Sequence, residues 1–387
     1  MRNGIILLLG VAALVSCKKP YAPSVISSPQ SFLVVEGTIN TNDTTTIKLS
    51  RTVRLDTTNT VKPVTHANLV IECDNGTKYG LTESANGNYK LPPADMDNSR
   101  KYRLRITMAD NTEYLSDFEQ AKNTPPVDSV NFKIGSNKLL LYVSSHDPAN
   151  NTRYYRFDYA ETWRFHVAYY SEWELKNKEI IFRPPEDVRF FCFANAHSTS
   201  IVLGSTAKLT QDVLYEQPVT EIASNSEKLG VRYSIIVHEY SMSAKEYTFW
   251  VNLKKNTEQL GSIFDAEPTE LEGNVHSLTK PTETVIGYVG AGKVSSKRIF
   301  IGREQLPAEW QVQEPFDCYP LDSLWYDNPH TRKNQVQEEI INTGYYIPVA
   351  PFFKGGIAPV GYVATPQVPC VDCTTRGYLK QPDFWQP

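Results

Sequence analysis

Four cysteines, at positions 192, 318, 370 and 373, suit either a metal site or disulfides. Cys370 and Cys373 form a C-x-x-C pair, and Cys192 and Cys318 lie far upstream. Four thiolates can bind zinc, but a single C-x-x-C pair is weak evidence for it. The N-terminal signal sequence described below indicates an exported chain, and cysteines of exported chains favour disulfides. A redox-active pair would be expected at a helix start, whereas this pair follows Pro369 in a proline-rich tail. We therefore predict that Cys370 and Cys373 bridge to Cys318 and Cys192, with the pairing left open.

The other motifs that could indicate an enzyme are incomplete. His238 and Glu239 begin a sequence of the metalloprotease type H-E-x-x-H, but Met242 stands where the second histidine ligand would be. The sequence contains no G-x-S-x-G motif and no P-loop, and the glycines of residues 287–292 lack the spacing of a dinucleotide-binding loop. We therefore predict a protein that is not an enzyme and that holds no cofactor and no metal ion.

Cys17 lies directly after an N-terminal apolar run and is a candidate for lipidation. Arg2 precedes the apolar residues 5–15, a run shorter than the roughly 20 residues that a membrane-spanning helix needs. This arrangement is typical of a secretory signal peptide, here residues 1–16. The sequence Leu-Val-Ser-Cys at positions 14–17 resembles the lipobox of bacterial lipoproteins, in which the cysteine sulfur receives a diacylglycerol. We expect Cys17 to be the lipidated N-terminus, and residues 17–30, rich in proline and serine, to form an extended tether.

The composition favours a large β-rich protein that does not bind nucleic acid. The chain has 387 residues, of which 41% are hydrophobic, and it contains 22 tyrosines, 16 phenylalanines, 20 glycines and 25 prolines. Aromatic residues are enriched in strands, and glycine and proline mark the turns between them. The net charge of -4 provides no basic surplus for a nucleic acid. No second long apolar run follows Cys17, so we expect a membrane association through the lipid alone.

Residues 31–124 read as a first domain made of short strands. In the segment 102–106 the apolar residues occupy every second position, as a half-buried antiparallel strand requires. About seven such strands separated by turn residues predict an immunoglobulin-like or transthyretin-like β-sandwich. Pro125 and Pro126 then interrupt the pattern, since proline cannot donate a ladder hydrogen bond. We place the domain boundary there.

Residues 127–387 read as a larger β-rich domain with a cysteine-stapled C-terminal tail. Within the predicted strand 154–165, three aromatic residues alternate with Arg156 and Asp158. Further aromatic residues follow this strand. The candidates for a ligand-stacking surface are Tyr159, Trp163, Tyr169, Tyr170 and Trp173. Such residues could stack on sugar rings, but sheet core and cross-strand pairs explain most of them more simply.

One helix is predicted, over about residues 243–260. Ser243 and Glu246 have the spacing of a capping box, and Gly261 suits the position after the last turn. Tyr247 and Trp250 lie on one face together with Val251 and Lys254. We expect this face to cover one side of the second domain's sheet.

Several segments in combination resemble one known family. They are residues 32–37, 233–237, 239–241, 261–265, 272–275, 287–288 and 297–301, Tyr247 and Trp250 in the predicted helix, and the ending 370–373, Gly377 and 382–385. The resemblance is to Bacteroidota cell-envelope lipoproteins grouped as domain of unknown function 4249. It implies a lipoprotein often encoded near TonB-dependent outer-membrane transporters, and it supplies no catalytic residues.

The resemblance suggests the outer membrane but leaves the side of it undecided. Lys18 and Lys19 follow Cys17, where surface-exposed lipoproteins of this phylum tend to carry acidic residues. The main hypothesis is a lipid-anchored, non-enzymatic accessory subunit of an outer-membrane β-barrel complex, namely a TonB-dependent nutrient transporter. One alternative is a lipoprotein that binds glycans or peptides through its aromatic surface. Another is a structural or assembly factor for outer-membrane barrels.

Overall fold

The structure is a computed structural model that describes residues 31–53, 61–258 and 271–386. The predicted signal peptide, Cys17 and the tether lie outside the described residues.

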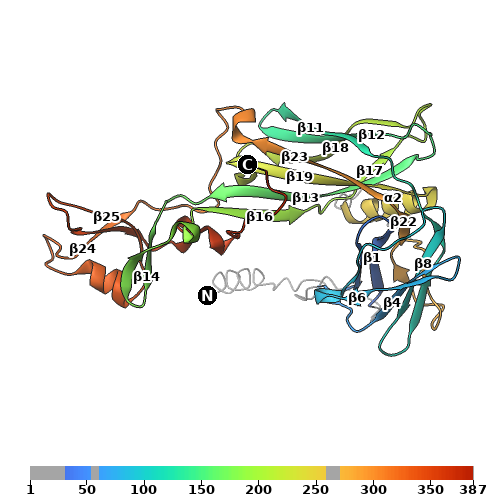
Figure 1. The fold of residues 1–387 in the computed structure, drawn as a ribbon, viewed down its shortest axis with the longest axis horizontal. Helices are drawn as coiled ribbons and strands as arrows, with labels where there is room; N and C mark the ends of the chain where they lie inside the picture. Colours follow the sequence, from blue (N-terminus) through green and yellow to red (C-terminus); the bar gives the residue numbers. More distant parts are fainter. Residues whose placement is uncertain (1–30, 54–60, 259–270, 387) are drawn as a thin grey trace, which may run out of the picture.

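The described chain folds into sheets and one long α-helix, which confirms the mainly β class. Two sandwiches pack side by side, and a third, smaller unit projects from the second one (Figure 1). We call these units sandwich 1, sandwich 2 and the distal module. No helix among the described residues has the length and apolar character needed to cross a bilayer.

Sandwich 1 consists of two sheets that enclose one core. In β8 (Lys101–Thr107), Tyr102, Leu104 and Ile106 are buried and the residues between them are not, which confirms the predicted alternation. The first sheet has the order β21-β1-β2-β7-β6, with β22 beside β1 and β3 beside β2, and the second has the order β20-β9-β8-β4-β5, with β10 beside β8. The other strands of sandwich 1 are β1 (Leu33–Asn40), β2 (Thr45–Arg51), β3 (Lys62–Pro63), β4 (Asn68–Cys73), β5 (Lys78–Gly80), β6 (Thr82–Glu83), β7 (Asn88–Leu91), β9 (Glu113–Ser116), β10 (Glu119–Gln120), β20 (Val275–Ser277), β21 (Val285–Ile286) and β22 (Gly290–Gly292).

Three short strands late in the sequence belong to sandwich 1. The predicted division into domains 31–124 and 127–387 assigns these residues to the second domain. β21 and β22 run parallel to β1, and β20 pairs with β9. Sandwich 1 is therefore discontinuous, and the strands within residues 275–292 belong to it. The returning strands are only two or three residues long, too short for a periodic pattern to show which sheet they join.

Sandwich 2 packs a three-stranded sheet, order β11-β12-β18, on a larger sheet, order β16-β13-β19-β23, with β17 also beside β13. The core between them contains Leu141 from one sheet and Phe157 and Ile235 from the other. β13 is the longest strand and pairs with β16, β17 and β19. The strands are β11 (Val127–Gly135), β12 (Lys138–His146), β13 (Tyr154–His166), β16 (Phe191–His197), β17 (Val202–Ser205), β18 (Val213–Ala223), β19 (Arg232–Ser241) and β23 (Val294–Gly302).

The distal module is built from two separate insertions and has its own small core. The hairpin of β14 (Trp173–Lys176) and β15 (Glu179–Phe182) follows β13, and β24 (Asp322–Trp325), β25 (Ile347–Phe352) and β26 (Gly361–Thr365) follow β23. Leu324, Ile340 and Tyr362 are buried together, with Trp173 packed against them. The second predicted domain therefore divides into sandwich 2 and this module, which lies at the left in Figure 1.

Two disulfides connect the C-terminal tail to sandwich 2 and to the segment that leads into the distal module. They are Cys192–Cys373 and Cys318–Cys370, so each cysteine of the C-x-x-C pair joins one of the two expected partners. Cys192 lies on β16, and Cys318 precedes β24. The remaining described cysteine, Cys73, is buried and unpaired.

The helix α2 (Ala244–Glu258) lies at the junction of the two sandwiches. Its N-terminus is capped as predicted, because the Ser243 hydroxyl oxygen accepts from the Glu246 backbone N–H at 3.1 Å. The predicted face packs on the larger sheet of sandwich 2, where Tyr247 lies against Tyr154 and Trp250 against Arg156. The most buried residues of the helix, however, are Glu246 and Phe249. The reason is that α2 faces sandwich 1 as well: a Cβ on Gly290 would lie only 2.6 Å from either Glu246 carboxylate oxygen. Residues 259–260 of the predicted helix lie outside the described residues.

Paired substitution of Cys192 and Cys373 by serine tests the role of the tail bridge. This bridge closes a sequence separation of 181 residues, so loop-closure entropy predicts a loss of about 3–5 kcal/mol in the free energy of unfolding. Limited trypsin digestion should also cut faster after Arg376 and Lys380, which lie in the released tail. Cys73→Ala is the control, because it removes a thiol that is not bridged. Equal digestion of the tail in all three proteins would contradict the assigned role.

Candidate functional site

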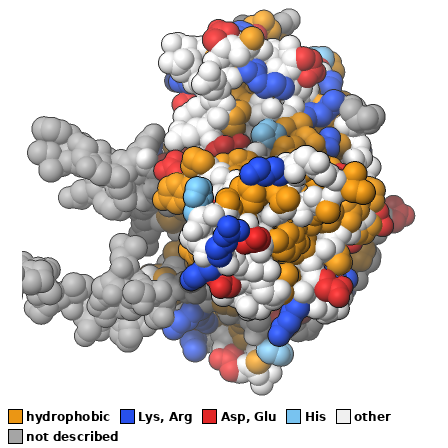
Figure 2. Space-filling view, turned by 90° about the vertical axis from the view of Figure 1, so that its left-hand side faces the viewer, with side chains coloured by type: hydrophobic (Ala, Val, Ile, Leu, Met, Phe, Trp, Pro, Cys, Tyr) orange, Lys and Arg blue, Asp and Glu red, His pale blue; other side chains and the backbone are white. Residues whose placement is uncertain are grey.

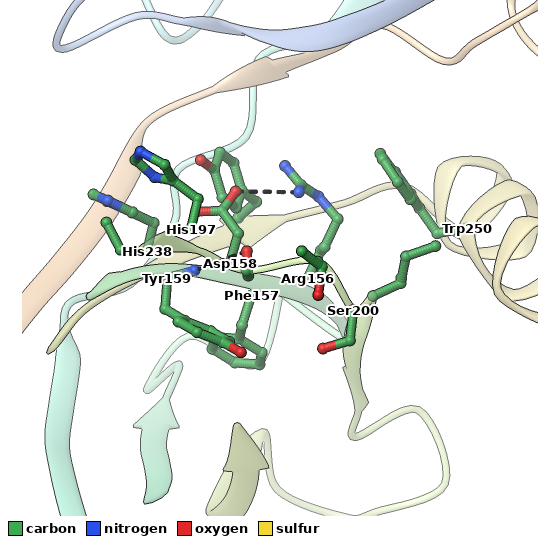
Figure 3. Close-up of a pocket in the computed structure, with 13 residues that line it drawn as sticks. Arg156, Phe157, Asp158, Tyr159, His197, Ser200, His238 and Trp250 are labelled. Atoms are coloured by element: carbon green, nitrogen blue, oxygen red, sulfur yellow. Dashed lines mark hydrogen bonds and ion pairs between the residues drawn. The ribbon is translucent and has the colours of Figure 1, made fainter. Parts of the chain in front are cut away.

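The candidate site lies on the outer face of the larger sheet of sandwich 2. Alternation along β13 directs Phe157 into the core and the neighbouring Arg156 and Asp158 to the outside. The register with β19 sets Arg156 opposite Tyr240 and Asp158 opposite His238. Figure 3 shows this division, with Arg156 and Asp158 on one side of the sheet and the Phe157 ring on the other.

These outward side chains form the floor of a cavity of about 490 Å³. The loop 197–201, which begins at the last residue of β16 and leads to β17, provides one wall, and Trp250 of α2 provides another. Figure 3 shows the two histidines, His197 and His238, at one end and Trp250 at the other. The volume falls within the range of about 300–1,000 Å³ that small-molecule sites occupy.

Arg156 is held rigidly in the floor of this cavity. Its guanidinium carbon lies 4.1 Å from the ring centroid of Tyr240 and 4.7 Å from that of Trp250, within the range of cation–π attraction. Its Nη1 also pairs with Asp158 Oδ2 at 3.2 Å. Because the Arg156 side chain is only 15% exposed, these contacts are better shielded from solvent than those of a surface pair. The arginine, its carboxylate partner and the two aromatic rings therefore form a preorganised unit.

His238 is held in its neutral form. Burial lowers the pKa of its imidazole, which at neutral pH then carries one N–H donor and one acceptor nitrogen. Among the described residues, none hydrogen-bonds the side chains of His197, Thr199, Ser200 or His238. These groups are available to a bound molecule.

The residue after His238 points the opposite way, into the core of sandwich 2. Glu239 is fully buried, and the Ser145 hydroxyl donates to its Oε1 at 2.9 Å, while Oε2 has no partner among the described residues. Burial raises the pKa of the Glu239 carboxyl to about 8, so it is protonated at neutral pH. His238 and Glu239 thus lie on opposite faces of one strand. The described residues contain no group of three His, Cys, Asp or Glu side chains placed to hold a metal ion.

The five aromatic residues proposed for ligand stacking do not form one surface. Tyr159 is buried in sandwich 2, where its hydroxyl bonds to Thr220 Oγ1 at 3.0 Å. Trp163 is half-buried, and its Nε1 donates to a carboxylate oxygen of Glu227. Trp173 packs edge-on against Tyr362 in the distal module. For these three residues the structure agrees with the simpler explanation, packing within the sheets and their cores, although Tyr159 also lines the cavity.

The other two members of that set lie at the surface between sandwich 2 and the distal module. The Tyr169 hydroxyl donates to the backbone oxygen of Tyr319 at 2.7 Å. Tyr170 is exposed and bonds to Glu172. Neither lines the cavity. Among the residues that do, the sequence indicates Tyr159 as a candidate, and Arg156 and Asp158 through their alternation with aromatic residues.

Fold and site together define a protein of two β-sandwiches with a projecting module and a polar surface cavity. The model of the family described as Domain of unknown function (DUF4249) matches residues 18–298, and the chain belongs to this family. No curated protein matches the chain. One similar solved structure is the two fibronectin type-III domain segment from chicken tenascin, at 13% identity, with 55% of this chain and 93% of that chain covered. Its TM-score of 0.17 is too low to carry an argument.

Glu239→Gln should stabilise the protein in a pH-dependent way. The folded-state pKa of about 8 exceeds the ordinary value of 4.5, so the wild-type protein loses stability as the pH rises from about 4.5 through 8. The variant has no such proton to lose, and its advantage in the free energy of unfolding should grow to a few kcal/mol, as an order of magnitude, at pH 8. Denaturant unfolding at pH 5, 6.5 and 8 measures this difference.

The matched control is Glu221→Gln, which changes an exposed carboxylate in the same sandwich. Its difference from the wild-type protein should stay within about 1 kcal/mol at every pH. A Glu239→Gln protein whose stability followed the wild-type pH dependence would show that Glu239 is ionised in the fold.

Proposed function

We propose that this protein is an outer-membrane lipoprotein that acts as a non-enzymatic accessory subunit of an outer-membrane β-barrel complex, namely a TonB-dependent nutrient transporter. The N-terminal sequence around Cys17 supports the lipid anchor, and the resemblance described above supports the envelope location. The observation that carries the proposal is the surface of the distal module, which has the character of a protein contact.

Apolar and aromatic side chains gather on this module. Figure 2 views the molecule from the end at which the module projects, and hydrophobic side chains cover much of the lobe that faces the viewer. The exposed large hydrophobic residues of the module and of the segment leading into it include Phe182, Phe316, Tyr319, Tyr326, Tyr345, Phe353 and Ile357. Exposed apolar residues are common singly, but a group of them on one unit marks an interaction surface.

The hairpin loop between β25 and β26 is the most exposed part of this surface. Ile357 is 101% exposed and Phe353 is 54% exposed. Gly355 lies between them with a φ of 74°, a backbone conformation that favours glycine. The glycine therefore allows the chain to turn at this point. Lys354 lies over the Trp325 ring at 5.9 Å. We infer that Phe353 and Ile357 insert into an apolar recess of the barrel partner.

The distal module is suited to this role because it is already ordered. Its own core and the Cys318–Cys370 bridge near its base reduce the conformational freedom that would otherwise be lost on binding. The module and sandwich 1 lie at opposite ends of the long axis in Figure 1. A lipid at Cys17, attached through the tether to sandwich 1, would then hold one end of the molecule at the membrane and leave the other free to engage the partner.

The first test addresses the anchor. Cys17→Ala should move the protein from the membrane fraction to the soluble envelope fraction, because the acceptor sulfur is lost. Cell fractionation with immunodetection measures the distribution, and the wild-type chain is the control. Protease treatment of intact cells expressing the wild-type chain then reports the side of the membrane, since digestion requires a body outside the cell. An unchanged membrane fraction for the variant would contradict lipid anchoring through Cys17.

The second test addresses the barrel contact. Detergent extraction and affinity purification of the wild-type chain should recover a β-barrel protein. The double variant Phe353→Ser and Ile357→Ser should recover at least about tenfold less of it, as expected for loss of two apolar contact residues.

The matched control for this experiment is Val213→Ser with Tyr215→Ser. These two residues are also exposed and apolar, but they lie on β18 of sandwich 2. Recovery should equal that of the wild-type chain. Purification of the wild-type chain without any barrel protein would refute the proposed function, and equal losses in both double variants would refute the assignment of the contact to the distal module.

A further inference from the structure

We propose that the cavity on the outer face of β13 and β19 binds an uncharged carbohydrate of one or two sugar rings. This site is separate from the distal module, and the inference does not depend on the barrel contact. Its floor is Arg156, Asp158, His238 and Tyr240, and its walls are the loop 197–201 and Trp250. Size, charge balance, free hydrogen-bonding groups and rigidity each support this class of ligand.

The charges around the cavity balance one another. The groups whose charge acts on His238 are Asp158 and Asp43, which are acidic, and Arg298 and Arg156, which are basic. Arg156 is already paired with Asp158 at 3.2 Å, and the imidazole of His238 is neutral. Among the described residues that line the cavity, Arg156 is the cation and Asp158 the carboxylate, and the two are paired. A phosphate or an ammonium group would therefore find no unpaired opposite charge in the lining. This balance favours a polar ligand without net charge.

The free polar groups suit a molecule with many hydroxyls. Thr199 and Ser200 provide hydroxyl groups, and His197 and His238 provide imidazoles, all without hydrogen-bond partners among the described residues. Hydroxyl groups and neutral imidazoles each donate and accept. A sugar hydroxyl also does both, so several of its hydroxyls can be satisfied at once. Trp250, with Arg156 against its ring, closes the opposite end of the cavity (Figure 3).

The loop that supplies these hydroxyls is fixed to the helix. Lys254 Nζ donates to the Ile201 backbone oxygen at 2.5 Å, and the Ile201 N–H donates to Glu258 Oε1 at 2.6 Å. Lys254 and Glu258 also form an ion pair along the helix. The end of the loop is therefore held in place before a ligand arrives, which reduces the entropy lost on binding.

The test is isothermal titration calorimetry of the full chain with neutral oligosaccharides. The probes are maltose, cellobiose, xylobiose and N,N′-diacetylchitobiose, each a neutral molecule of two sugar rings, and the detergent must carry no sugar headgroup. We expect saturable binding of at least one probe with a dissociation constant in the micromolar to millimolar range. Asp158→Asn and His238→Phe should weaken this binding at least about tenfold, as expected for loss of one hydrogen bond to a polar ligand. The control Asp327→Asn changes a carboxylate of the distal module, and binding should be unchanged.

Two further variants allow the test to be carried out even if a floor variant does not fold. Thr199→Ala and His197→Gln alter exposed residues at the rim, so they carry the test if a floor variant fails to fold. Absence of binding by all four sugars, or equal affinity in the floor, rim and control variants, would overturn the proposal. Binding of inorganic phosphate or of a tripeptide in place of the sugars would overturn the assignment to an uncharged carbohydrate. None of these binding results changes how much barrel protein is recovered by affinity purification. The carbohydrate site and the barrel contact can therefore be refuted independently.

Discussion

The pairing of β13 with β19 is the interaction on which the rest of the molecule depends. The ladder runs from Tyr155 opposite Ser241 to Arg164 opposite Arg232, and β16, β17 and β23 extend the sheet from it. One face of the two strands supplies core residues and the other supplies the floor of the cavity. The chain beyond β13 then leads into the distal module. A shift of one residue in this register would exchange the two faces and remove both the core and the site.

The second constraint is the junction between the sandwiches, where polar groups are buried and must be satisfied. The Thr124 hydroxyl donates to the Lys293 backbone oxygen at 2.6 Å, and the Tyr288 hydroxyl donates to Glu119 at 2.5 Å. Burial raises the pKa of Glu246 to about 7, and its carboxyl fits only because residue 290 is glycine. The helix α2 contacts both sandwiches, because its Phe249 ring packs on Tyr288 of sandwich 1 and its Tyr247 ring packs on Tyr154 of sandwich 2. Lys254 of α2 in turn holds the loop that lines the cavity.

The proposed functions use two different consequences of this architecture. The cavity is rigid because its arginine, its loop and its tryptophan are each fixed by contacts that exist without a ligand. The distal module is rigid because it has a separate core and a disulfide near its base. Under the two proposals, a partner would be bound at one end of the molecule and a small molecule at its body, and neither event would require the protein to refold.

The sequence by itself determined the mainly β class, the alternation in β8, the cap at Ser243 and the four cysteines that form the bridges. These features depend on neighbours in the chain or on residue chemistry, so local pattern is enough to predict them. Only the tertiary structure decided that residues 275–292 return to sandwich 1, that Tyr159 and Trp173 enter different cores, and that Arg156, His238 and Trp250 surround one cavity. These features arise from pairing between segments far apart in the chain, and no local period of the sequence encodes such pairing.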